Sequence, residues 1–182
     1  MEQYLDTIYR YFPQDKSPSD LDYSYTQEIK RFFELGEKLK REHGNFERLC
    51  AVLEKRLGMR NTDYSFIGDN CRTVMAAIPA SYGISRFPLV VINVSGMVDY
   101  YSTYLTKQVS FSQITTLEDE TLDENEQKLV NDLANIVNEF YLNFKPFPME
   151  YYAKEVPLIF SSKRYNELAT YYECLMTTHI LP

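Results

Sequence analysis

The stretch FPLVVINVSGMVDYYSTYLTKQVSF, residues 87–111, decides the fold of this 182-residue chain. Its first half carries an apolar run from Leu89 to Val94, interrupted only by Asn93, which is typical of a β-strand covered on both faces. Ser95 and Gly96 then give a turn signal. In the tyrosine-rich segment that follows, alternate side chains point to opposite faces of a strand. The stretch therefore predicts an antiparallel pair of strands, the second nearer an edge of the sheet.

Tyrosine is unusually abundant in this chain, which has 16 tyrosines, 11 phenylalanines and no tryptophan. A tyrosine ring can pack against apolar groups while its hydroxyl stays in contact with water, so such residues gather at borders and interfaces. Two interpretations remain open. The tyrosines of the second strand belong either to a half-buried sheet under a helix or to an exposed face that binds a partner through Tyr101 and Tyr104.

Helical periodicity appears on both sides of this hairpin. Apolar residues recur at helical spacing in the segment after Ser24, which offers a capping box with Gln27, and again from Phe46 to Leu57 before Gly58. The short break at Gly44 predicts that these two helices form an antiparallel pair. A third helix should begin at a capping box, either Thr121 with Glu124 or Asp123 with Glu126, and a last one should span about 162–177.

These elements predict a single domain over residues 1–182 with an irregular N-terminal arm at about 1–23, where prolines and small polar residues cluster. Residues 59–86 fit a loop with a short helix or strand. The expected fold class is α+β and mostly helical, with amphipathic helices packed around a small antiparallel sheet.

One short strip carries nearly all of the net charge of −7. Its six carboxylates have no basic residue among them: Glu118, Asp119, Glu120, Asp123, Glu124 and Glu126. Acids in the first turn of a helix interact favourably with the helix dipole, but those before the helix gain nothing from it. The strip is either a solvated loop or a docking site for a basic partner, formed by Glu118, Asp119, Glu120, Asp123 and Glu124.

No catalytic, cofactor-binding or metal-binding motif is present in the sequence. His43 and His179 lack a ligand pattern, Cys71 in GDNC has only Arg72 as a possible activating neighbour, and no glycine-rich phosphate loop occurs. The acidic balance disfavours nucleic acid as a partner. Three widely spaced cysteines and the lack of an apolar signal or membrane segment predict a cytoplasmic protein that is not bound to a membrane.

The order of these elements resembles small bacterial immunity proteins, the antidotes encoded beside polymorphic or type VI secreted toxins. Three regions carry the resemblance: YSYTQEIKRFFEL (23–35) with FERLCAVLEKRLG (46–58), then PLVVINVSGMVDYYSTYL (88–105), and finally NFKPFPMEYYAKEVPLI (143–159) with ELATYYECLM (167–176). The resemblance implies a non-catalytic protein that binds a cognate toxin and blocks its active site. A toxin with a basic cleft would match the acidic strip.

Two alternatives from other classes stay open at the level of sequence. One is a small cytoplasmic enzyme, such as a hydrolase, whose site is assembled from distant residues. The other is a structural adaptor in a larger assembly. The sequence does not discriminate among oligomeric states.

Overall fold

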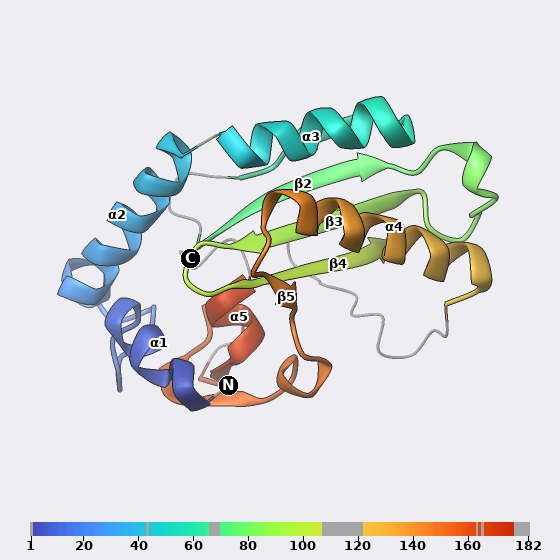
Figure 1. Ribbon diagram of the computed structural model, residues 1–182. Coiled ribbons are helices and arrows are strands. Elements are labelled where there is room, and N and C mark those ends of the chain that lie inside the picture. Colours follow the sequence, from blue (N-terminus) through green and yellow to red (C-terminus); the bar gives the residue numbers. More distant parts are fainter. Residues whose placement is uncertain are drawn as a thin grey trace.

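The computed structural model describes residues 2–42, 44–65, 70–106, 122–162, 164 and 166–176 (Figure 1). Its elements, in chain order, are η1 (Glu2–Tyr4), α1 (Leu5–Tyr11), η2 (Tyr23–Tyr25), α2 (Gln27–Arg41), α3 (Gly44–Leu57), β1 (Asn61–Asp63), β2 (Cys71–Ala77), η3 (Ala80–Tyr82), β3 (Leu89–Ser95), β4 (Tyr100–Thr106), α4 (Glu124–Phe140), β5 (Lys145–Pro146), η5 (Met149–Tyr151), β6 (Glu155–Phe160), β7 (Leu168–Thr170) and α5 (Tyr171–Met176).

The predicted hairpin is the centre of the main sheet. Within the described residues this sheet has the order β1-β2-β3-β4-β5, and β1 to β4 are antiparallel to their neighbours. Ile92 of β3 pairs with Val74 of β2 and with Thr103 of β4. The short β5 runs parallel to β4 and pairs with Tyr100 and Tyr101. The hairpin and its alternation of faces are therefore confirmed.

The expected fold class is wrong in its proportions. The chain is α+β, but the described part forms a five-stranded sheet and a second, two-stranded sheet of β6 and β7, so it is not mostly helical around a small sheet. Residues 59–86 supply β1 and β2, and the segment predicted as a helix at 162–177 supplies β7 before the six-residue α5. Short apolar runs do not distinguish a buried strand from a helix, because both are covered on several sides.

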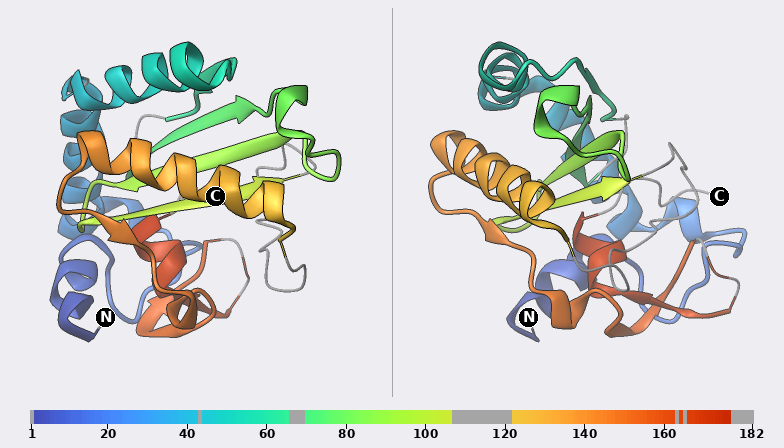
Figure 2. Two further views of the ribbon diagram at one scale, coloured as in Figure 1. Left: turned by 45° about the vertical axis from the view of Figure 1, so that its right-hand side comes forward. Right: turned by 90° about the vertical axis from the view of Figure 1, so that its right-hand side faces the viewer.

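Helices α3 and α4 cover one face of the main sheet and form the first core. Figure 2 shows the two helices on the same side of the strands. Of the apolar residues expected in the core, Phe46, Leu49 and Leu53 of α3 and Leu133 and Ile136 of α4 are buried, whereas Leu57 and Phe140 are only partly buried. They pack against Val74, Val90, Ile92 and Leu105, which share one face of the sheet. Gly58 ends α3 with a left-handed backbone conformation, φ +67°, that glycine adopts without a steric cost.

The second core is built from both ends of the chain. Ile8 and Phe12 of the N-terminal region pack with Phe32 of α2 and with Leu175 and Met176 of α5. Residues 5–11, expected to be part of an irregular arm, thus form the packed helix α1. The helix α5 lies against β3 and β4. The α5 helix therefore covers the face of the sheet opposite α3 and α4, and α1 packs in the same core.

Two local predictions at α2 are also corrected. The N-cap is Thr26, whose Oγ1 accepts a hydrogen bond from Ile29 N at 3.4 Å, and not Ser24. The helices α2 and α3 do not form an antiparallel pair, because they diverge from their junction in Figure 1 and contact different elements. The α2 helix packs on α1 and β2, whereas α3 packs on α4 and β1. Each helix finds its apolar partner elsewhere, so the short connection does not fold them together.

We expect Leu53→Ala to lower the free energy of unfolding by about 2–5 kcal/mol, because the leucine is fully buried between α3 and the sheet. Denaturant unfolding followed by circular dichroism measures this difference. Leu142→Ala is the matched control, because this leucine is 84% exposed and its truncation should change stability little. Equal stability of both variants and the wild type would contradict the described core.

The β3–β4 turn depends on close contact with α2. A Cβ atom added at Gly96 would lie 2.9 Å from Leu39 Cγ and closer still to the leucine methyl groups. We expect Gly96→Ala to cost about 1–3 kcal/mol in unfolding free energy through overpacking. The double variant with Leu39→Ala should recover part of this loss in a double-mutant cycle.

Gly44→Ala is the control for this cycle, since an added Cβ there meets nothing within 4 Å. It should be neutral or slightly stabilising, because alanine favours a helix more than glycine does. Additive effects of Gly96→Ala and Leu39→Ala would show that the turn and α2 are not in contact.

Candidate functional site

The structure describes only the part of the predicted acidic docking strip that lies at the start of α4. Glu118, Asp119 and Glu120 lie outside the described residues, so their part of the prediction stays untested. Asp123 is the N-cap of α4, and Glu124 lies exposed in the first turn. Asp123 Oδ1 accepts a hydrogen bond from Glu126 N at 2.9 Å, and Glu126 Oε2 accepts one from Asp123 N at 2.9 Å. Of the two capping boxes considered, the Asp123–Glu126 box is confirmed, and it gives Asp123 a structural role.

Glu126 is 0% exposed and joins α4 to the connection between β2 and β3. Arg86 Nε donates to Glu126 Oε1 at 2.9 Å, and Arg86 Nη2 donates to Oε2. This hydrogen bonding to Arg86 lowers the pKa of Glu126, with burial acting in the opposite direction. The innermost carboxylate of the strip therefore stabilises the fold and is not presented to a partner.

The lowered pKa of Glu126 predicts a pH-dependent stability. The pKa of Glu126 in the folded protein lies below the ordinary glutamate value of 4.5, so the stabilisation is fully present above pH 4.5 and is lost as the pH falls through the folded-state pKa. At pH 7, Glu126→Gln should lower the free energy of unfolding by about 1.5–3 kcal/mol, the usual contribution of hydrogen bonds to charged groups.

Denaturant unfolding from pH 7 to pH 3 tests this prediction. The difference between wild type and Glu126→Gln should shrink at the acidic end. Glu124→Gln, an exposed carboxylate in the same helical turn, should differ little from wild type throughout. If the difference in unfolding free energy between wild type and Glu126→Gln stays constant with pH, the Glu126–Arg86 ion pair does not contribute to stability.

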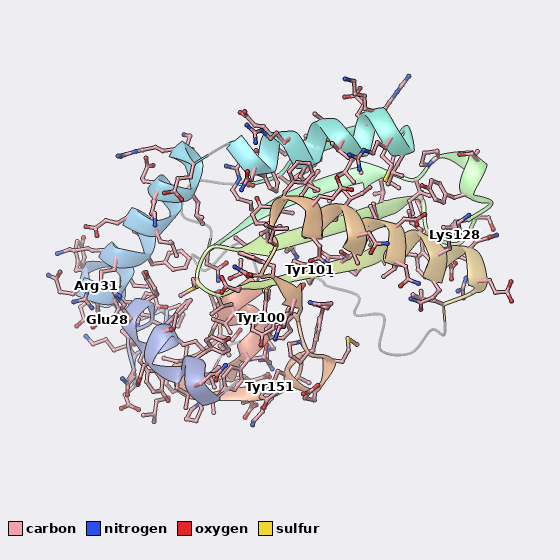
Figure 3. The ribbon with its side chains drawn as sticks, in the orientation of Figure 1. Glu28, Arg31, Tyr100, Tyr101, Lys128 and Tyr151 are labelled. Carbon is pink, nitrogen blue, oxygen red and sulfur yellow. The ribbon has the colours of Figure 1, made fainter. Side chains whose placement is uncertain are left out.

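The two tyrosines predicted to bind a partner point to opposite faces of β4. Tyr101 is 2% exposed and belongs to the first core beneath α4, so its ring is not available at the surface (Figure 3). Tyr104 is half-buried on the other face, and burial raises its pKa to about 12. The structure thus does not bring Tyr101 and Tyr104 together into one exposed surface.

Most of the aromatic surplus near β4 belongs to the second core. The Phe147 ring packs against Tyr100, Tyr152 and Tyr172 with centroid distances of 5.8, 5.3 and 5.4 Å. Tyr152 and Tyr172 stack at 4.3 Å. The Tyr172 hydroxyl lies 2.9 Å from Ser102 Oγ, which satisfies its polar end inside the protein. Tyr172 therefore packs with a hydrogen-bonded hydroxyl, and Figure 3 shows Tyr100 and Tyr151 in this region.

The described cysteines are placed for packing. Cys71 is buried, and its Sγ lies 3.3 Å from Met176 O and 3.5 Å from Thr73 Oγ1. Burial raises the pKa of Cys50 to about 11 and that of Cys174 well above its usual value. A thiol with a raised pKa is a weak nucleophile at neutral pH. His43 and His179 lie outside the described residues, and within the described ranges no group of His, Cys, Asp and Glu is close enough to hold a metal ion.

The most exposed large apolar side chain of the described residues, Leu21, lies between α1 and α2, in a segment that we call the Leu21 loop (residues 13–26). Leu21 is 96% exposed and Tyr25 is 75% exposed. Asp20 and Asp22, both exposed, flank the leucine directly. In Figure 2 this blue segment lies on the side of the molecule opposite α4. An apolar side chain held out between two carboxylates is a candidate contact point for another protein.

The Leu21 loop is closed by its own hydrogen bonds. Asp20 N donates to Ser17 O at 2.9 Å, and Asp20 Oδ2 accepts from Ser17 N at 2.8 Å. Lys16 forms an ion pair with Asp22 across the base of the tip. Tyr23 N donates to Asp20 O at 3.0 Å, which continues the turn into η2.

The loop is also anchored to the body of the protein at both ends. On one side, Asp15 N donates to Leu158 O at 2.9 Å, and Lys16 forms a parallel bridge with Ile159 of β6. On the other, the buried Tyr23 side chain precedes α2. The tip that carries Leu21 is therefore preorganised.

The sequence analysis did not identify this loop. Its one signal was the isolated leucine of SPSDLDYS, which stands between two aspartates in a proline- and serine-rich segment. Apart from Tyr23 and Tyr25, no apolar residue lies within four positions of this leucine, so the sequence pattern does not assign it to a core. Its exposure is decided by the anchoring of the loop to β6.

Comparisons of the chain with protein-family models, with curated protein sequences and with solved structures give no match. Among the helices of the described ranges, none combines the length and the apolar character that crossing a membrane requires. The fold defines the chain as an α+β protein in which a hydrogen-bonded loop exposes Leu21 between two aspartates.

Proposed function

We propose that this chain is a cytoplasmic, non-catalytic immunity protein that binds a cognate bacterial toxin and blocks its active site. The observation that carries the proposal is the exposed Leu21 on a loop held in place by hydrogen bonds and by β6. The order of elements that resembles small immunity proteins supports the same function. The exposed leucine and the order of elements both favour binding of another protein, and neither requires an enzymatic reaction.

The energetics of such a contact are favourable. Burying a leucine side chain in a partner contributes about 1.5–3 kcal/mol. A preorganised loop avoids most of the cost of ordering, which is otherwise about 0.5–1.5 kcal/mol for each immobilised side chain. Interfaces concentrate their binding energy in a few such anchors.

The buried cysteines also agree with a binding role. Cys71 and Cys174 serve the packing of α5 against the sheet, and burial raises the pKa of Cys174, which favours its neutral thiol over the nucleophilic thiolate. The polar network beside them, Thr73, Asn93, Ser102 and Tyr172, is internally hydrogen-bonded. It attaches α5 to β3 and β4.

A stoichiometric titration distinguishes this proposal from an enzyme. The toxin encoded by an adjacent reading frame is purified, and its activity is measured with increasing amounts of this chain. A binder should abolish the toxin activity when the two proteins are about equimolar, because each molecule of this chain blocks only one toxin molecule. In a bacterial host, co-expression should restore growth that the toxin arrests.

Cys71→Ala should leave the titration endpoint unchanged, provided that circular dichroism shows a folded variant. Loss of inhibition in this folded variant, or complete inhibition at a small fraction of equimolar protein, would favour the enzyme alternative. Failure of the wild-type chain to bind or inhibit the toxin would overturn the proposal.

A further inference from the structure

We infer that this protein self-associates as a two-fold dimer through the outer face of α2, with the two copies of this helix packed antiparallel. The occupant of this face is therefore a second copy of the same chain. Four charged side chains of α2 carry the inference: Glu34, Glu37, Lys38 and Arg41. The contact is independent of the proposed function and uses a surface other than the Leu21 loop.

These four side chains form one stripe on the solvent side of α2. Their positions follow the spacing i, i+3, i+4 and i+7, which places them on one face of a helix. The helix is held from its other side by buried residues: Ile29, Phe32, Leu35 and Gly36. The side chain of Arg41 is 80% exposed and that of Lys38 is 66% exposed. In Figure 1, α2 lies at the outer edge of the molecule, where a second copy can approach the stripe.

The stripe borders a groove of about 490 Å³. The described residues that line this groove all belong to α2: Phe33, Glu34, Glu37, Lys38, Arg41 and Glu42. The half-buried Phe33 ring and the aliphatic stems of the lysine and the arginine give the groove apolar surface beneath the charged ends. A second helix that lies along the groove covers this apolar surface and meets the charges at the same time.

The order of charges along the stripe is complementary to its own reverse. Glu34 and Glu37 make the N-terminal half negative, and Lys38 and Arg41 make the C-terminal half positive. In an antiparallel pair with its two-fold axis between positions 37 and 38, Glu34 faces the partner's Arg41 and Glu37 faces the partner's Lys38. The axis generates each pair twice, so four pairs of opposite charge form, whereas a parallel pair would put like charges together. Because two acids balance two bases, the stripe does not select a strongly acidic or strongly basic partner.

Within one molecule these charges are weakly paired. Arg41 lies 4.0 Å from Glu37, and Lys38 lies 3.9 Å from Glu42, and such exposed pairs contribute little to stability. Glu34 makes no ion pair or hydrogen bond with the part of the chain that the structure describes. The helix dipole explains the bases in the last turn of α2, but not the two acids before that turn, because its effect is confined to the terminal turns. A second copy supplies the opposite charges that these acids lack.

The test uses the purified chain alone, and sedimentation velocity measures its oligomeric state between about 1 and about 200 µM. Wild type should form a dimer that dissociates on dilution. Its Kd should weaken about tenfold between about 50 and about 500 mM salt, because exposed charges are screened. Two variants should each be monomeric over this range: Glu34→Lys with Glu37→Lys, and Lys38→Glu with Arg41→Glu. In each variant all four charges of the stripe have the same sign, so two copies repel each other.

An equimolar mixture of the two variants tests the antiparallel arrangement. The introduced lysines then face the introduced glutamates, and the unchanged charges also face their opposites, so the mixture should recover a dimer. Arg48→Glu with Lys55→Glu, at two exposed positions of α3, is the matched control, because it changes the net charge as much as the second variant does. This control should dimerise as wild type does. Circular dichroism shows whether each variant folds, and the salt series of wild type tests the charges without any substitution.

Each outcome decides a separate part of the inference. A wild-type chain that stays monomeric at the highest concentration overturns the dimer and leaves the proposed function standing. A wild-type dimer that both variants retain uses another surface, which overturns the assignment to α2. Loss of the dimer in both variants without recovery in the mixture overturns the antiparallel arrangement. The expected result is a loss in each variant alone, recovery in the mixture and no change in the control.

Discussion

The arrangement of the N-terminal half of the protein depends on the buried guanidinium group of Arg72, whose side chain is 7% exposed. Arg72 Nη1 donates to Leu39 O at the end of α2 at 3.0 Å, and Nε donates to Ser65 Oγ at 2.9 Å. Nη2 donates to Asp63 of β1, and the guanidinium lies 4.4 Å from the ring centroid of Phe46 in α3. A buried charge is costly unless all its donors are partnered, so Arg72 fixes β1, α2 and α3 around β2.

The two faces of the main sheet are covered by different kinds of contact. The face under α3 and α4 is apolar and is packed by long amphipathic helices. The face under α5 uses polar groups: Ser95 Oγ donates to Leu175 O at 2.7 Å, and Asn93 Nδ2 donates to Tyr172 Oη at 3.3 Å. The buried residues of this six-residue helix also pack in the second core, and the directional hydrogen bonds specify where the helix lies. This explains why polar side chains occur inside β3 and β4.

Residues that stand out in the sequence have structural roles, and this bears on where a partner would bind. The tyrosines and the innermost acid of the strip, which the sequence marks as unusual, stabilise the fold. Tyr101 lies under α4, Tyr172 of α5 contacts Asn93 and Ser102 of the sheet, and Glu126 forms an ion pair. The proposed contact point arises where the chain crosses from α1 to α2, in a segment with few apolar residues. The tyrosines and Glu126, which stand out in the composition, thus have structural roles. The candidate interface is instead identified by the exposure of Leu21 on a hydrogen-bonded loop.

The sequence by itself determined the features that depend on neighbours along the chain. The β3–β4 hairpin with its alternating faces, the apolar face of α3 up to Gly58, and the Asp123–Glu126 cap of α4 all follow from local periodicity and local hydrogen bonds. Only the tertiary structure decided that residues 71–77 join the sheet, that residues 168–170 pair with β6, that Tyr101 is buried and that Leu21 is exposed. Strand pairing and burial depend on which distant segment covers a residue, and the periodicity of a short run carries no information about that segment.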